Sequence, residues 1–231
     1  MKPVVHADRA ALVATVADAI ESLIAELVER QGHATIALTG GSVGTELLAA
    51  LADRPIDWQR LVLTWSDERF VDAGSSDRNA TQAREALIDR VAIPSTSVRE
   101  LPAADGGSLD AAAEAATAML RELGPIDLTL LGMGPDAHVA SLFPGLPGVH
   151  VGGSAVIAVR DSPKPPPERL SFTLEAINAS DRVWLVVAGA DKADAAARVL
   201  GGADLAEAPA VGVAGRLETL MHLDAEAASQ L

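Results

Sequence analysis

The sequence repeats one local pattern, in which a short and continuously apolar run ends in glycine or charged residues and a stretch with helical periodicity follows. HATIALT leads into GGSVG and then TELLAALAD, and RVWLVVAGADKADAAARVLGG has the same three parts. Strands that are apolar throughout are typical of a parallel sheet buried on both faces. We therefore predict an α/β fold with a mostly parallel, Rossmann-like sheet and helices on both faces.

Other segments fit the same scheme. Apolar residues recur at helical spacing from Asp8 to Arg30, and Gly32 is expected as the C-cap. Ser108 is expected as the N-cap of a later helix. No repeat or linker divides the chain, so residues 1–231 are expected to form one domain. The other expected helices span 79–91, 108–123 and 224–230, with a short one after residue 134, and the other expected strands span 61–65, 126–134, 154–161 and 219–224.

Composition excludes several classes of function. The chain has 32 acidic and 18 basic residues, a net charge of −14, and no basic run, so no nucleic-acid partner is expected. It has no cysteine, which excludes thiol nucleophiles and fits a reducing cytoplasm. Asp8, Arg9 and Asp18 interrupt the apolar N-terminal segment, so neither a signal peptide nor a membrane span is expected. No exposed apolar stripe stands out, which predicts a soluble monomer or weak homodimer.

Four polar or glycine-rich clusters follow directly after expected strands, at 40–42, 67–69, 132–138 and 189–192. In open parallel sheets, ligands bind beyond the carboxyl ends of the strands, which meet at one edge. We therefore expect the four clusters to form one site.

The first two clusters suit an anionic ligand. Gly40, Gly41 and Ser42 form a glycine turn before a helix, where free N–H groups bind anions, although an ordinary tight turn explains the pattern equally well. The turn lacks the GK[ST] ending of a P-loop and is not GxGxxG. Asp67 and Arg69 flank a strand end and are suited to sugar hydroxyls and an anionic group, or form a surface salt-bridge cluster.

The third cluster contains the candidate catalytic base. Of the five histidines, only His138 falls in a glycine-rich loop at a strand end, with the carboxylate of Asp136 two residues before it. An imidazole titrates near neutrality, so it can take a proton from water and return it to a leaving alkoxide. A solvated loop histidine is the alternative. One histidine without an HxxxH or Asp-rich set predicts no metal and no cofactor.

Cations occur where an anionic ligand requires them. The segment SPKPPPER carries Lys164 and Arg169 on a stiff proline run, which can hold cations over an anionic ligand. The alternative is that the segment is a plain connector or an SH3-type ligand. Lys192 lies in the first turn of an expected helix, where a cation opposes the helix dipole unless an anion binds there.

Five motifs occur in one order: LTGGSVG, SDERFV with SDRNA, LLGMGPDAHVASLFPG, SPKPPPERLSFTL and GADKADA. From about residue 5 to the end, the chain closely resembles the 6-phosphogluconolactonases of the pentose phosphate pathway. The resemblance implies hydrolysis of 6-phospho-D-glucono-1,5-lactone to 6-phosphogluconate, on the fold shared with glucosamine-6-phosphate deaminases. Its phosphosugar lactone is the implied partner.

The resemblance also implies roles for individual residues. His138 matches the general base and Arg69 the substrate-binding arginine. The turn with Ser42 matches the substrate cradle, and Arg169 with Lys192 matches the phosphate clamp; Asp136 and Asp67 match polar positions of the site. Two departures are present: Ala137 stands where glycine is usual, at a cost of about 1 kcal/mol if φ is positive, and Met221–His222 replace a tryptophan-containing strand.

In the expected reaction, water activated by His138 attacks C1, and the imidazolium then protonates the ring oxygen. N–H groups near Gly132–Gly134 or the side chain of Arg69 are candidates to stabilise the oxyanion. One alternative is a glucosamine-6-phosphate deaminase-like isomerase, although its relatives carry a glutamate shortly after the histidine and this chain has SLFPG. The other is a non-catalytic sugar-phosphate sensor, which Ala137 leaves open although no helix-turn-helix is present.

Overall fold

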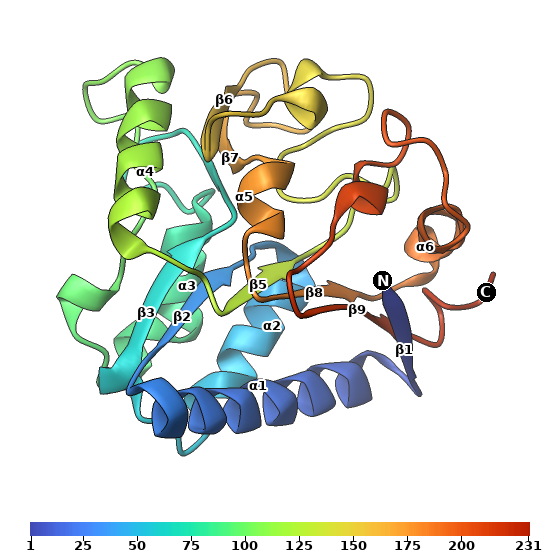
Figure 1. Ribbon diagram of the computed structural model, residues 1–231, viewed down its shortest axis with the longest axis horizontal. Coiled ribbons are helices and arrows are strands. Elements are labelled where there is room, and N and C mark those ends of the chain that lie inside the picture. Colours follow the sequence, from blue (N-terminus) through green and yellow to red (C-terminus); the bar gives the residue numbers. More distant parts are fainter.

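The computed structural model describes residues 1–231 and contains two sheets (Figure 1). The larger sheet has the strand order β1-β9-β8-β5-β2-β3, and every neighbouring pair is parallel. Its strands are β1 (Lys2–His6), β2 (Ala34–Leu38), β3 (Leu61–Trp65), β5 (Leu128–Leu131), β8 (Arg182–Val187) and β9 (Glu218–Asp224). The smaller sheet is antiparallel, with the order β4 (Asp67–Arg69), β7 (Arg169–Phe172) and β6 (Val156–Val159).

Helices cover both faces of the larger sheet. In Figure 1, α1 and α2 lie below it, whereas α4, α5, α6 and the smaller sheet lie above it. The helices are α1 (Arg9–Gln31), α2 (Gly41–Ala52), α3 (Asn79–Ala86), α4 (Leu109–Leu123), α5 (Leu174–Asn178) and α6 (Ala193–Leu200). The predicted fold class is therefore confirmed. No helix combines the length and the apolar character that a membrane crossing requires.

Capping residues set the ends of the long helices as expected. Asp8 accepts a hydrogen bond from the N–H of Ala11 at the start of α1, and Gly32 ends the helix with φ 86°. Ser108 caps α4 through the N–H of Ala111. These local signals worked because a cap involves only residues within one turn.

Four expectations about elements were wrong. The segment 154–161 does not join the parallel sheet, because β6 pairs antiparallel with β7 across the proline-rich connection. No helix follows residue 134: turns lead to a 3₁₀ turn at Pro147–His150, because proline and left-handed residues interrupt the segment. Helix α3 ends at Ala86, and a separate 3₁₀ turn follows. Residues 224–230 form only turns, which Asp224 begins by accepting from Ala227 N–H.

The register of the strands brings the predicted clusters together. Leu38 at the end of β2 is paired with Trp65 at the end of β3, and Leu131 of β5 is paired with Leu185 of β8. A core of 56 buried apolar residues fixes this arrangement on both sides of the sheet. The segments that follow these strands therefore emerge at one edge.

Candidate active site

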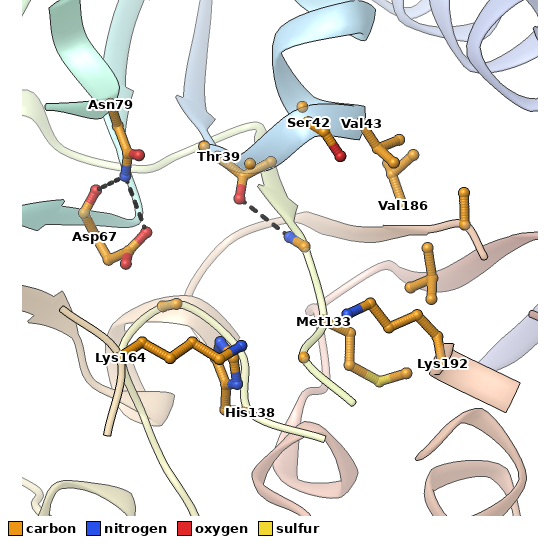
Figure 2. A pocket seen from close by; sticks show the side chains of 18 of the residues that line it. Thr39, Ser42, Val43, Asp67, Asn79, Met133, His138, Lys164, Val186 and Lys192 are labelled. Atoms are coloured by element: carbon orange, nitrogen blue, oxygen red, sulfur yellow. Dashed lines mark hydrogen bonds between the residues drawn. The ribbon is translucent and has the colours of Figure 1, made fainter. Parts of the chain in front are cut away.

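A cavity of about 300 Å³ lies at the carboxyl edge of the larger sheet. All four predicted clusters contribute to its wall, together with the proline-rich loop between β6 and β7 (Figure 2). The sequence-predicted residues that line it are Gly40, Gly41, Ser42, Asp67, Arg69, His138, Arg169 and Lys192; Thr39, Asn79 and Lys164 line it too. Asp136 is the one predicted site residue that lies outside this lining.

The glycine turn begins α2 rather than preceding it. Gly40 is the N-cap and makes no side-chain capping bond, so the first N–H groups of the helix are left for a ligand. Gly41 has φ 81°, a conformation that favours glycine. A Cβ on Gly40 would lie 1.9 Å from Oδ1 of Asn79, so only glycine fits there. Each glycine is thus required for its own physical reason.

His138 and Asp136 form a close pair. Nδ1 of His138 lies 2.5 Å from Oδ1 of Asp136. Burial alone would raise the pKa of Asp136, but the hydrogen bond and the charge of His138 outweigh it and lower this pKa to about 2. An ionised carboxylate only accepts hydrogen bonds, so Nδ1 carries the proton and Nε2 keeps its lone pair. Because His138 lines the cavity and Asp136 does not, the carboxylate supports the imidazole from behind.

The loop that carries His138 is tightly constrained. A Cβ on Gly134 would lie 2.0 Å from Nδ1 of His138, so this glycine lets the pair close. The ring of Phe143 packs on the imidazole with centroids 4.6 Å apart. Ala137 is fully buried and has φ 64°, so the positive φ anticipated for this position is present. The alanine therefore stores strain, yet the His138–Asp136 contact is closed.

Asp67 is held from two sides by buried partners. Its Oδ2 accepts a hydrogen bond of 2.7 Å from Oγ of Ser141, which lies in the His138 loop. Asn79 donates from Nδ2 to the carbonyl oxygen of Asp67 at 2.9 Å and lies 3.4 Å from its Oδ1 (Figure 2). The sequence interpretation treated Asn79 as a helix start only. It is the first residue of α3 and also part of the cavity wall.

Arg69 is the last residue of β4 and lines the cavity. Its Nη1 donates to the carbonyl oxygen of Asp77, and its buried Nε has no hydrogen-bond partner. An unpaired buried donor is costly, and an anionic ligand is the kind of group that would satisfy it.

Arg169 and Lys164 differ from the sequence interpretation. Arg169 donates from Nε to Pro166 O at 3.1 Å and from Nη2 to Lys164 O at 3.0 Å and Pro165 O at 3.2 Å. Its guanidinium also lies 5.7 Å from the ring centroid of Phe143. Most of its donors thus hold the proline-rich loop in shape. That loop also presents Lys164 to the cavity, a residue that the family resemblance does not place in the phosphate clamp.

Three cations converge on one side of the cavity. Burial lowers the pKa of Lys164, the charges of Lys192 and Arg169 lower it further, and Asp136 and Asp191 oppose them. Nζ of Lys192 pairs with the exposed Asp191 at 2.9 Å. Like charges brought together in this way favour an anionic ligand. No group of three or more His, Cys, Asp or Glu side chains is arranged to hold a metal ion.

Two of the expected oxyanion donors are already engaged. Gly132 N–H donates to Oγ1 of Thr39 at 3.0 Å, and Gly134 N–H donates to the carbonyl oxygen of His138 at 3.0 Å. The N–H groups of Gly132 and Gly134 therefore shape the loop, and Met133 between them lines the cavity. Arg69 and the start of α2 also present donors to the cavity.

The chain matches one family model over residues 7–221, described as glucosamine-6-phosphate isomerases/6-phosphogluconolactonase. It belongs to this family. A 6-phosphogluconolactonase of Streptomyces coelicolor is 47% identical over 99% of this chain and 94% of its own length.

Solved structures of the family have the same fold. A 6-phosphogluconolactonase from Trypanosoma brucei is 29% identical and superposes with a TM-score of 0.87, covering 100% of this chain and 98% of its own. A monomeric glucosamine-6-phosphate deaminase is 18% identical, also with a TM-score of 0.87, and covers 100% of both chains. At 18% identity the deaminase supports only the shared fold, which the sequence analysis expected.

Proposed function

We propose that this chain hydrolyses 6-phospho-D-glucono-1,5-lactone to 6-phosphogluconate with His138 as the general base. The observation that carries this proposal is the His138–Asp136 pair, whose imidazole lines the same cavity as Lys164, Arg169 and Lys192. The lactonase names of full-length relatives support the same reaction.

The reaction needs one proton to move twice. Nε2 of His138 takes a proton from water as the water oxygen attacks C1 of the lactone, and the negative charge passes to the carbonyl oxygen. When the tetrahedral intermediate collapses, the C1–ring oxygen bond breaks and the imidazolium returns the proton to that oxygen. The ionised Asp136 stabilises the imidazolium between these steps.

Lys164, Lys192 and the remaining donor capacity of Arg169 bind the phosphate, far from C1. Arg69 and the N–H groups at the start of α2 (Gly40–Ser42) bind the lactone oxygens, and Asp67 accepts a sugar hydroxyl. Binding energy at the phosphate orients the lactone for attack. This assignment adds Lys164 to the clamp and gives Arg169 mainly a supporting role.

The deaminase-like alternative fits this cavity less well. Asp67 is the one carboxylate that lines it, and the residue that packs on the imidazole is Phe143 rather than an acid. The closed His138–Asp136 contact also argues against a catalytically silent sensor.

The test compares His138→Asn with wild type in the decay of freshly made 6-phosphogluconolactone, with glucosamine-6-phosphate as the control substrate. Loss of positioned acid–base transfer should lower kcat by about 10²–10⁴-fold. His33→Asn is a matched control, because His33 is exposed near the start of β2 at the opposite edge. Equal turnover by wild type and His138→Asn would refute the assignment.

The wider setting follows from the same properties. We take residues 1–231 to act as one domain, because one apolar core includes residues from Leu12 to Ala227. A cysteine-free chain fits the cytoplasm, and its large exposed apolar side chains are few, which favours a monomer or weak homodimer.

A further inference from the structure

Glu68 is a buried carboxylate between two cavity residues. Because side chains alternate along β4, Asp67 and Arg69 line the cavity while Glu68 does not. Its side chain is 1% exposed, and burial raises its pKa although three backbone N–H groups and Arg78 oppose the shift. A charged group in this position needs a specific reason.

The Glu68 carboxylate joins β4 to the start of α3. Its Oε1 accepts from the N–H of Arg69 at 2.8 Å and of Asn79 at 2.7 Å. Its Oε2 accepts from the N–H of Ala80 at 2.9 Å and lies 3.7 Å from Nη2 of Arg78. The N-cap of α3 makes no side-chain capping bond of its own, so Glu68 supplies that cap from another element.

We propose that Glu68 is a positioning residue for the lactonase reaction, which fixes Arg69 and Asn79 relative to each other across the cavity wall. Two of the three N–H groups that it accepts from belong to these cavity residues. This inference rests on the proposed function. It assigns Glu68 no contact with substrate.

A carboxylate is needed because every neighbour of its oxygens is a donor. In Glu68→Gln, one oxygen keeps two of the N–H bonds, but the amide NH₂ faces the N–H of Ala80 or the guanidinium of Arg78. The start of α3 must then shift, and Asn79 and Arg69 shift with it.

Asp127 provides a matched control. It is 6% exposed and accepts from Thr35 N–H at 2.8 Å and from Nε2 of Gln31 at 2.9 Å, so it is also a buried carboxylate that holds backbone. It precedes β5, at the edge of the sheet opposite the cavity. Asp127→Asn should therefore reduce stability without a specific effect on turnover.

The experiment measures kcat, KM and calorimetric binding of 6-phosphogluconate for wild type, Glu68→Gln and Asp127→Asn. We expect Glu68→Gln to lower kcat by about tenfold or more, with product affinity within about threefold of wild type, because the phosphate cations are held by other elements. A binding stoichiometry near that of wild type shows that the lost turnover is not lost folded protein. Asp127→Asn should keep wild-type kcat per binding site.

A double variant tests whether Glu68 acts through Arg69. In an Arg69→Ala background, Glu68→Gln should lower kcat by a smaller factor than it does in the wild-type background, because one of the two cavity residues that it positions is absent. Wild-type kcat in Glu68→Gln, full additivity with Arg69→Ala, or an equal loss per site in Asp127→Asn would each overturn the proposal.

Glu68→Asp covers the case in which the glutamine variant does not fold. It keeps the charge but withdraws both oxygens by one methylene, so kcat should fall while product binding persists; unchanged kcat would overturn the proposal. If the wild-type protein had no lactonase activity, the proposed function itself would be wrong. If the wild type were active and its Glu68 variants were equally active, only the role of Glu68 would be wrong.

Discussion

At the scale of single residues, Asp136 is the group on which His138 depends most directly. Its pKa of about 2 keeps it ionised near neutral pH, so its charge is constant during turnover. Asp136→Asn removes that charge and permits the other imidazole tautomer. We expect kcat to fall by at least about 100-fold with little change in KM, measured from the decay of fresh lactone. A kcat within threefold of wild type would contradict the supporting role of Asp136.

Ala137 raises the question of whether strain beside the base impairs it. Its φ of 64° is strained for alanine, but Ala137 is also fully buried. Ala137→Gly relieves the strain and removes a buried methyl, effects of about 1 kcal/mol each and of opposite sign. We therefore expect kcat/KM within about threefold of wild type and a small change in the midpoint of thermal unfolding. A large gain in kcat would show that Ala137 does tilt the histidine.

Among the elements, the proline-rich loop separates the roles of two cations. Lys164→Ala should raise KM about tenfold with little change in kcat, because it removes one phosphate contact and leaves the reacting end intact. Arg169→Ala should lower both stability and kcat/KM, because three loop carbonyls lose their donor. Lys2→Ala, at an exposed lysine on β1, is the control for loss of charge. If Arg169→Ala raised KM more than Lys164→Ala did and left stability unchanged, Arg169 would be the phosphate ligand and the proposed roles of the two residues would be wrong.

The strand pair β1–β9 contains a pair of buried histidines that lies outside the cavity lining. Nε2 of His6 lies 3.1 Å from Nδ1 of His222, and Trp184 packs edge-on against His222. Burial, and then the charge of His6, lowers the pKa of His222 to about 4. Burial also lowers the pKa of His6.

This cluster predicts a loss of stability in mild acid. In the unfolded chain His222 binds a proton near its ordinary pKa of 6.5, whereas in the folded chain it does so only near 4. The free energy of unfolding is therefore highest above about pH 6.5. It should fall by roughly 3 kcal/mol as the pH drops towards 4. Urea unfolding at several pH values measures this slope. His222→Phe removes the titration and should flatten the slope between pH 6.5 and 4; an unchanged slope would assign it to other groups.

The elements also show what the sequence could reveal. The inner strands of the parallel sheet were predictable because each is a local apolar run, and the long helices because their caps are local. Strand β1 was not predicted, because it is short and mostly exposed and only its pairing with β9 makes it a strand. The smaller sheet was not predictable, because β4 has three residues and β7 carries Arg169 and Ser171. Those polar residues are buried by contacts with distant segments, which the local pattern does not contain.

Some residues of the candidate site could also be predicted from the sequence, and others could not. His138, Arg69 and the glycine turn were identifiable because each follows a strand end in a parallel sheet. Ser141 was not identifiable as a partner of Asp67, because 74 positions separate them. The structural part of Arg169 was not identifiable, since only the folded loop shows that its Nε and Nη2 donate to loop carbonyls.

At the scale of the whole molecule, the surface predicts weak self-association. The large apolar side chains that are exposed are Met1, Val5, Val151, Leu217 and Leu231. A net charge of −14 further opposes association through repulsion. We expect sedimentation velocity at physiological salt to give a single species near 23.7 kDa at micromolar concentration. A stable dimer at nanomolar concentration would contradict this expectation.

The parallel pairing of β1 with β9 also constrains how the protein is made. The contact between His6 and His222 joins residues 216 positions apart, so β1 emerges from the ribosome long before its only neighbour in the sheet exists. At about 5–20 residues per second, β1 waits roughly 10–40 s for that neighbour. During translation its backbone edge is open to other nascent chains, and completion of the sheet is a late, long-range step.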